Sequence, residues 1–391
     1  MLINRRTTIA LCLATFLLYA WPMYRWLSCL DQRPAAFSAY LPSISDESHS
    51  PFITEEFITP GLNSGAVHAS SICQLSDGTL GAAWYAGSRE GGKDVAIYFA
   101  VRGPGEHVPW SKSRAIVNRK SASKELRRFI RKLGNPLLFA DSKDRFWLLY
   151  VTVTIGGWSG SSLNLKISDD GGMTWTQSIR LTLSPFFNVS ELVRNSPLPM
   201  KDGSFGIPIY HECMGKFPEM LWIWLTKEDQ KIGFRKTRMV GGRMFIQPSV
   251  VVCGSHKARA FYRNCSDERA VGTAFTGDTG ATWSRPRMLC LPNPDSGLSA
   301  LALSEGRILL AFNDSKRNRD ILSLAVSSDG GANWLRIGEI ENNPGHEFSY
   351  PYLIRTQDGR IHLVYTWRRK RIKHVVFNEN WLNAQIKRVS K

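Results

Sequence analysis

An eight-residue motif that occurs three times constrains the fold of this chain more than any other feature. The copies read SDDGGMTW at 168–175, TGDTGATW at 276–283 and SSDGGANW at 327–334. In each, an Asp can accept hydrogen bonds from backbone N–H groups of a turn, and a Gly supplies positive φ. A motif that recurs in this way indicates a structural repeat rather than a catalytic signature.

The motif belongs to a longer repeat of short strands. Six apolar segments each end in a tight polar turn and continue into a second strand, with the turns near Asp77, Lys143, Asp202, His256, Glu305 and Asp358. A third strand follows most copies, and three of these run directly into the motif, whose Trp begins a fourth strand. Four antiparallel strands repeated six times predict an all-β fold, a six-bladed β-propeller over residues 61–391, in which radial closure protects the sheet edges.

The N-terminal region is predicted to lie outside the propeller. Residues 1–6 are basic and should remain in the cytoplasm, while the apolar segment 7–27 predicts a signal-anchor helix. Residues 28–60 are rich in Pro and Ser and predict a linker. We therefore expect a propeller tethered to a membrane on the side away from the cytoplasm. A cleaved signal peptide followed by secretion, or a buried helix, is the alternative.

The charge of the chain favours acidic partners. Lys+Arg number 50 and Asp+Glu 33, giving a net charge of +17, which attracts anionic sugars, lipid headgroups or nucleic acid. Part of the charge lies in residues 118–133, whose apolar spacing predicts one amphipathic basic helix on the surface. Nucleic-acid binding is not expected, because the basic residues lack interleaved stacking aromatics. No spacing typical of metal ligands stands out, and no cofactor is expected.

The candidate site is predicted on the face opposite the repeated motif. In a four-stranded blade, the starts of the first strands and the loops between the second and third strands share that face. The candidate residues found there are His68, Arg89, Asp94, Trp158, His211, Glu212, Gln247, Arg263, Asp295, Arg317, Arg319 and Tyr350. Polar groups converging on a funnel predict a binding site, and arginines that grip carboxylates favour an acidic carbohydrate or glycoconjugate as ligand.

Two of these residues suit chemistry as well as binding. Cations near Tyr350 would lower the pKa of its phenol and make it a nucleophile or a base. Asp94 lies on a glycine-rich loop and suits a general acid. His68 and His211 are alternative bases.

At this point the chain resembles the sialidases (neuraminidases) and their BNR-repeat relatives, over roughly residues 61–382. The resemblance implies a nucleophile at Tyr350, in SYPYLIRTQDGR, and an acid/base at Asp94, in GSREGGKDVAIYFAVR. It also implies two members of an arginine triad that holds a carboxylate. One is Arg263, and the other is Arg317 or Arg319.

Two positions depart from the pattern of that family. His68 stands where the first arginine of the triad is expected, and Gln247 stands where a Glu normally assists the Tyr. The amide of Gln247 can orient a phenol but cannot accept its proton.

Three functions remain open. The favoured one is an exo-glycosidase for an anionic sugar, in which Tyr350 attacks the anomeric carbon and Asp94 protonates the leaving oxygen. The second is a uronate polysaccharide lyase, in which Arg263 neutralises a carboxylate while Tyr350 or a His removes a proton. The third is a non-catalytic carbohydrate-binding propeller tethered to a membrane. The oligomeric state is left open.

Overall fold

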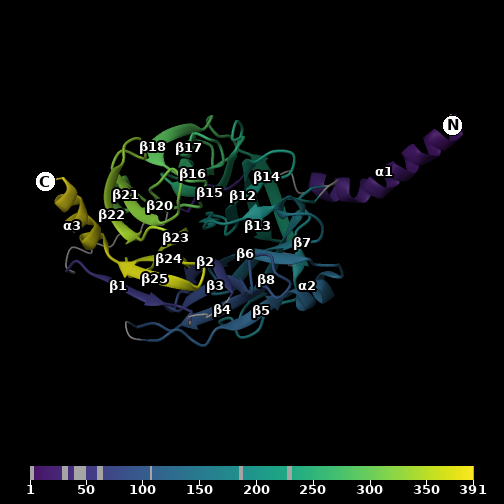
Figure 1. Ribbon diagram of the computed structural model, residues 1–391. Coiled ribbons are helices and arrows are strands. Elements are labelled where there is room, and N and C mark those ends of the chain that lie inside the picture. The colour runs from purple at the N-terminus through teal and green to yellow at the C-terminus, as the bar shows by residue number, and fades with distance from the viewer. Residues whose placement is uncertain are drawn as a thin grey trace.

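Six antiparallel sheets surround a central axis in the computed structural model of the chain (Figure 1). The structure describes residues 4–28, 34–38, 50–59, 65–105, 108–184, 188–226 and 231–390. Each sheet is one blade, so the predicted all-β, six-bladed propeller is confirmed.

The first three blades follow one another along the chain. Blade one consists of β2 (Ala66–Gln74), β3 (Leu80–Gly87), β4 (Ala96–Arg102) and β5 (Arg114–Asn118). Blade two consists of β6 (Lys132–Ala140), β7 (Phe146–Val153), β8 (Ser161–Ser168) and β9 (Ile179–Arg180). Blade three consists of β10 (Leu192–Val193), β11 (Leu198–Pro199), β12 (Phe205–His211), β13 (Phe217–Leu225) and β14 (Ile232–Arg238). Because β10 and β11 both pair with β12, the first strand of blade three is interrupted at residues 194–197.

The last three blades complete the ring. Blade four consists of β15 (Phe245–Val252), β16 (Ala258–Asn264), β17 (Ala270–Thr276) and β18 (Arg287–Pro292). Blade five consists of β19 (Ser299–Ala302), β20 (Ile308–Asn313), β21 (Ile321–Ser327) and β22 (Leu335–Asn342). Blade six consists of β23 (Phe348–Arg355), β24 (Ile361–Trp367), β25 (Arg371–Phe377) and β1 (Ile53–Phe57). Helix α3 (Glu379–Val389) follows, and short 3₁₀ helices cover Trp158–Gly160 and Ser304–Gly306.

Strand β1 closes the propeller. It lies antiparallel to β25, with Glu56 opposite His374, and so supplies the outer strand of the last blade. Residues 53–57 were predicted to be linker, and that prediction is wrong, because their pairing places them inside the propeller. The predicted linker residues 39–49 and the propeller start at 61–64 lie outside the described residues.

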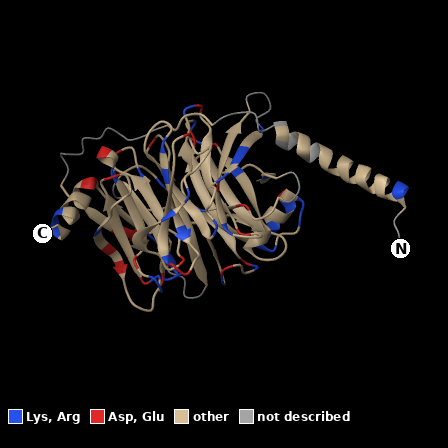
Figure 2. Ribbon diagram, turned by 90° about the horizontal axis from the view of Figure 1, so that it is seen from above, with Lys and Arg blue, Asp and Glu red and all other residues tan. Residues whose placement is uncertain are grey.

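The apolar N-terminal segment forms α1 (Arg5–Ser28), which extends away from the propeller in both views (Figures 1 and 2). None of the helices in the described part of the chain combines the length and the apolar character that crossing a bilayer requires. The expected signal anchor is therefore not supported, although a helix does form at the expected place.

The repeated motif is a turn between the third and fourth strands of a blade, as predicted. In the first copy, the Asp170 carboxylate accepts bonds from Ser168 Oγ and from the backbone N–H and Oγ1 of Thr174. The Trp175 ring packs edge-on against Phe99 of the preceding blade, with ring centroids 5.4 Å apart. Through its Trp, the motif therefore packs one blade against the preceding blade.

The predicted basic helix is shorter than expected. Helix α2 covers Arg119–Leu126, and Arg127 ends it with a left-handed φ of 51°. Ile130 is still buried, but Phe129 is exposed. The apolar residues of the sequence keep a helical spacing past the end of α2 and into β6, and this is why the predicted helix was too long.

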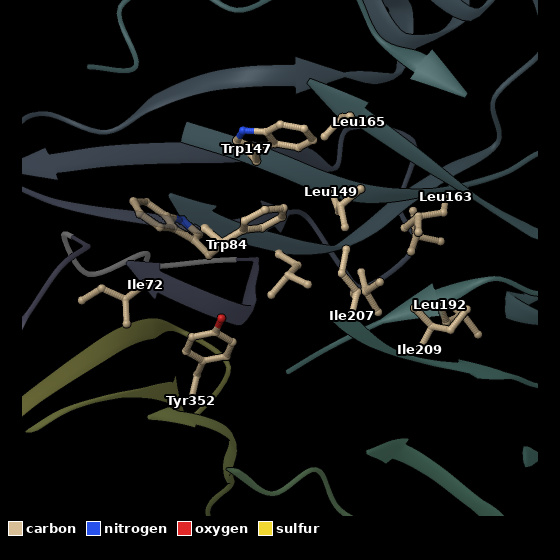
Figure 3. Packing of buried hydrophobic residues seen from close by; sticks show 14 of the residues in the cluster. Ile72, Trp84, Trp147, Leu149, Leu163, Leu165, Leu192, Ile207, Ile209 and Tyr352 are labelled. Atoms are coloured by element: carbon tan, nitrogen blue, oxygen red, sulfur yellow. The ribbon is translucent and has the colours of Figure 1, made fainter. Parts of the chain in front are cut away.

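Large apolar side chains fill the space between blades. Trp84 of blade one and Trp147 of blade two belong to one buried cluster with Ile207 of blade three and Tyr352 of blade six (Figure 3). Alternate residues of each strand point into these interfaces, as expected of strands that are covered on both faces. This packing holds the first strands of the blades in place, and these strands carry the candidate site.

Candidate functional site

The first strands of blades one, two, four and six share the same irregularity. Each has a β-bulge whose first residue has positive φ: Ala69 (52°), Asn135 (45°), Gln247 (52°) and Tyr350 (56°). A bulge leaves a residue out of the strand pairing and re-aims its side chain. Here the amides of Asn135 and Gln247 donate to one shared acceptor, Tyr210 Oη, at 3.1 and 3.2 Å. The bulges thus bring side chains of separate blades together.

Tyr350 and Arg263 form the centre of the site. Arg263 Nη1 donates to the phenol oxygen of Tyr350 at 3.1 Å and to Gln247 Oε1 at 3.4 Å. Arg263 Nε pairs with Asp295 Oδ1 at 2.6 Å. Four predicted site residues are therefore in direct contact, and the guanidinium of Arg263 joins them.

A chain of ion pairs surrounds this centre. Glu347 Oε1 lies 3.4 Å from Arg319 Nη1, and its Oε2 lies 2.6 Å from Arg369 Nε. Arg369 Nη1 also pairs with Glu90 at 2.9 Å. The guanidinium of Arg319 lies 5.8 Å from the centroid of the Tyr350 ring. Glu347 therefore holds two arginines together, one of which lies beside the ring of Tyr350.

Arg194 lies against the ring of Tyr350 from inside the fold. It is 2% exposed, and its Nη1 donates to the carbonyl oxygen of Ser70 at 2.9 Å. Its Nη2 donates to the carbonyl oxygens of Tyr350 and Pro351. The guanidinium carbon lies 5.2 Å from the Tyr350 ring centroid, so a buried cation contacts both the backbone and the ring of the candidate nucleophile.

His68 also packs on Tyr350. The two rings meet edge to face with centroids 4.5 Å apart, and His68 is buried. Burial, together with Arg369 and Arg319, holds the pKa of His68 well below its usual value. The ring is therefore neutral at ordinary pH, and it cannot supply the positive charge of an arginine.

The environment of Tyr350 favours its ionised form. Burial raises the pKa of the phenol, but the charges of Arg263 and Arg319 and a hydrogen bond with Gln247 lower it by more, despite the opposing charge of Glu90. The pKa therefore lies below its usual value of 10.0.

Asp94 is not brought into this cluster. Its carboxylate turns back on its own loop and accepts bonds from Ser88 N–H and Oγ at 2.6 and 2.8 Å. These bonds lower the pKa of Asp94. The prediction that Asp94 converges with Tyr350 and the arginines is therefore not met in this conformation, because the loop satisfies the carboxylate locally.

The remaining predicted residues divide between the rim and the surface. Arg89 and Arg317 are exposed on loops, so Arg319 rather than Arg317 faces Tyr350. Trp158 stacks over Gly134 at the start of β6, and Lys132 Nζ lies 6.0 Å from its ring centroid.

Blade three contributes His211 and Glu212. His211 stacks on Phe217 with ring centroids 4.7 Å apart, and burial with the nearby Lys236 lowers its pKa to about 4. Burial raises the pKa of Glu212, although Lys216 and Arg263 oppose the shift. Glu212 thus lies within electrostatic reach of Arg263, whereas His211 stacks on Phe217 of its own blade.

The sequence did not identify Arg369, Glu347 or Tyr210 as site residues. Arg369 follows Arg368 in a tight hairpin where both have positive φ, 54° and 52°, and the sequence does not say which of the two turns inward. Glu347 lies three residues before the predicted nucleophile Tyr350. This closeness in the sequence was a signal that Glu347 also belongs to the site.

Comparisons with known proteins agree with this architecture. The family model of the BNR repeat-like domain matches residues 78–363, more than half of the chain. No curated protein sequence matches the chain.

Solved structures with the same fold include enzymes that act on sialic acid. The Hadza microbial sialidase Hz136 is 16% identical with a TM-score of 0.62, and the match covers 80% of this chain but 65% of that chain. A protein of unknown function from Dyadobacter fermentans is 12% identical with a TM-score of 0.67, covering 83% and 99%. The intramolecular trans-sialidase from Ruminococcus gnavus is 14% identical with a TM-score of 0.62, covering 82% and 96%. The chain thus spans under two thirds of the first of these proteins, and such low identities show the fold alone.

Proposed function

The chain belongs to the BNR repeat-like domain family, and on that premise we propose that it is a sialidase-like exo-glycosidase for sialic acid or a related acidic sugar. One observation carries the proposal. The phenol oxygen of Tyr350 lies 3.1 Å from Arg263 Nη1 at the meeting point of the blades, with Arg319 beside the ring. A tyrosine surrounded by guanidinium groups suits covalent catalysis on an anionic sugar.

In the proposed reaction Tyr350 gives up its phenol proton to solvent, and its Oη attacks the anomeric carbon while the bond from that carbon to the leaving oxygen breaks. Asp94 donates a proton to the leaving oxygen. Water then attacks the glycosyl-tyrosine, Asp94 takes a proton from that water, and the sugar is released with the tyrosine oxygen restored. A tyrosine nucleophile is a recognised exception to the scheme with two carboxyl groups.

Three arginines are available to hold the carboxylate of the sugar. Arg263 and Arg319 were predicted for this role, and Arg369 adds a third guanidinium through its ion pair with Glu347. Arg369 also exerts the largest charge effect on His68. A guanidinium therefore lies near the position where the sequence places His68 instead of an arginine. Bidentate pairing with a carboxylate is the characteristic interaction of this side chain.

Asp94 must move before it can act as the acid. While its carboxylate accepts two bonds from Ser88, its pKa is depressed and it is ionised at neutral pH. When the loop turns toward a bound sugar, those bonds break and the pKa of Asp94 rises. Loop closure would thus both position the acid and load it with a proton.

Non-catalytic binding of an acidic carbohydrate is the second candidate function. It is favoured by the hydrogen bonds that tie the Asp94 carboxylate to Ser88, and by the amide of Gln247, which cannot serve as a base. The lyase alternative is weaker, because burial and positive charge make His68 a poor base.

Hydrolysis of a fluorogenic sialoside by the full-length protein tests the proposal. We expect turnover in the wild type, no detectable turnover in Tyr350→Phe, and a loss of about 10²–10⁴-fold in Asp94→Asn, the usual effect of removing a general acid. Tyr98→Phe is the matched control, since Tyr98 stacks on Trp84 between strands of blade one.

The outcomes distinguish the three functions. An unsaturated product that absorbs in the near ultraviolet would identify a lyase. Binding of sialyl-oligosaccharides that persists in both variants, with no turnover by any form of the protein, would identify a binding module and overturn the proposal.

A further inference from the structure

Arg194 is a buried cation without a carboxylate partner. Its contacts in the described part of the chain are three backbone carbonyl oxygens and the faces of Tyr350 and Tyr352, whose ring centroids lie 5.2 and 5.5 Å from its guanidinium carbon. Its Nε is buried and has no hydrogen-bond partner. Burying a charge is costly unless an opposite charge lies nearby, so the site needs a negative charge beside Arg194.

The charged groups around Tyr350 do not balance. Arg263, Arg319 and Arg369 are matched by three carboxylates, those of Asp295, Glu347 and Glu90. Farther out, Glu212 and Lys216 offset each other. Arg194 contacts Tyr350 directly, and no carboxylate of the described residues pairs with it.

The groups that face Tyr350 come from every blade packed against it. The charged ones are Arg194, Arg263, Arg319 and Glu90, and the titratable neutral ones are His68, Tyr85 and Tyr210. Burial raises the pKa of Tyr85 and Tyr210, and His68 is neutral. Tyr350 itself is therefore the titratable group best placed to carry the negative charge that Arg194 needs beside it.

We propose that Arg194 is a positioning residue that holds Tyr350 in place and stabilises its phenolate form, so that the phenol ionises more readily than a free tyrosine although Gln247 cannot act as a base. Arg194 contacts both the backbone carbonyl and the ring of Tyr350. It therefore fixes the position of Tyr350 and also stabilises a negative charge on the Tyr350 oxygen. When Tyr350 ionises, its phenol proton goes to solvent rather than to a neighbouring base. The catalytic meaning of this arrangement rests on the proposed glycosidase function, but the ionisation of Tyr350 does not.

The ionisation can be measured without a substrate. The near-ultraviolet absorbance of tyrosinate is recorded against pH for the full-length wild type and for Tyr350→Phe, and their difference isolates one phenol. We expect a midpoint below 10 in the wild type. In Arg194→Gln the midpoint should rise by about 1–3 pH units, the usual effect of losing one nearby opposite charge.

Two further variants separate charge from structure. Arg194→Lys keeps the charge and should restore most of the wild-type midpoint, whereas Arg287→Gln removes an exposed arginine of β18 and should leave the midpoint unchanged. An unchanged midpoint in a folded Arg194→Gln variant, or a wild-type midpoint at or above 10, overturns the proposal.

A second measurement covers the case in which Arg194→Gln does not fold. If Tyr350 is the counter-charge, the stability deficit of Tyr350→Phe relative to the wild type widens as pH rises from the folded midpoint toward 10. A deficit that is constant over this range overturns the proposal. Because neither measurement uses turnover, a protein that hydrolyses no sialoside could still confirm the phenolate, and an active enzyme could still refute it.

Discussion

Tyr350 and Gln247 hold backbone conformations that their side chains disfavour. Both have left-handed φ angles, 56° and 52°, which cost about 1–3 kcal/mol each for residues of this kind. Such conformations persist where the surroundings enforce them, and here the bulge, Arg194 and Arg263 do so. Part of the backbone strain of the described residues therefore lies at the candidate site.

Gly297 keeps the space that these two side chains occupy. A Cβ atom at this position would lie 3.1 Å from Gln247 Oε1 and 3.2 Å from Tyr350 Cδ1. We expect Gly297→Ala to displace the ring, to lower the free energy of unfolding by about 1–3 kcal/mol, and to shift the titration midpoint of Tyr350. Chemical denaturation and tyrosinate absorbance check this. Gly157→Ala, whose Cβ meets nothing within 4 Å, is the control, and equal effects of both substitutions would contradict the expectation.

The sequence located the centre of the site but not its surroundings. Tyr350, Gln247 and Arg263 each occupy a position fixed by counting strands, so their proximity could be predicted from the repeat. Arg369 could not, because a hairpin turn aims adjacent side chains in different directions. Asp94 lies on a loop whose local hydrogen bonds to Ser88 compete with the predicted role, and no periodicity reports such a competition.

In the first copy of the repeated motif, two adjacent glycines have different roles. Gly171 and Gly172 both have positive φ, 67° and 87°. A Cβ at Gly171 would meet nothing within 4 Å, whereas one at Gly172 would lie 2.3 Å from Phe99 Cε1 of the preceding blade. Only the second glycine therefore permits close approach of the two blades.

This difference predicts unequal effects of the same substitution. Gly171→Ala should lower the free energy of unfolding by about 1–2 kcal/mol, the cost of left-handed φ for a residue with a Cβ. Gly172→Ala should lower it by about 2–4 kcal/mol, because overpacking against Phe99 is added. Thermal and chemical unfolding of both variants measure the difference. A Gly171→Ala variant that is as unstable as Gly172→Ala would show that the turn, rather than the contact between blades, matters.

Element types were easier to predict than element ends. The strands and the turns carrying the motif follow from alternation and glycine positions. The helix expected over 118–133 ends at Leu126, because Arg127 takes a left-handed conformation. The buried Ile130 follows the helix and the buried Leu133 lies in β6, but their spacing in the sequence also fits a helix. Strand β1 was missed because five residues, ITEEF, have no partner in the nearby sequence.

A buried histidine pair lies where β1 closes the ring. His362 Nδ1 lies 2.9 Å from His374 Nε2, and His374 Nδ1 lies 2.9 Å from Glu56 Oε1 of β1. Burial lowers the pKa of both histidines, and for His374 the carboxylate of Glu56 opposes the shift without reversing it.

The pair should make the propeller sensitive to acid. The unfolded chain binds protons at these histidines near pH 6.5, while the folded chain does not. The free energy of unfolding should therefore be steady above that pH and should fall below it, by up to about 1.4 kcal/mol per pH unit for each histidine. Denaturant titrations at several pH values check this. His374→Gln should flatten the dependence and His256→Gln, at a histidine of the β15–β16 turn, should not. Equal slopes in all three proteins would refute the role of the pair.

The pairing of β1 with β25 also sets an order of events during synthesis. Glu56 and His374 are 318 residues apart, so at about 5–20 residues per second the first strand leaves the ribosome roughly 15–60 s before its partner exists. During that time five blades can assemble, while the sixth has only its outer strand β1, because β23, β24 and β25 are not yet made. A chain arrested in this interval exposes an unpaired edge that invites pairing with another chain. The last strands to be made therefore end the period in which a nascent chain is most prone to aggregate.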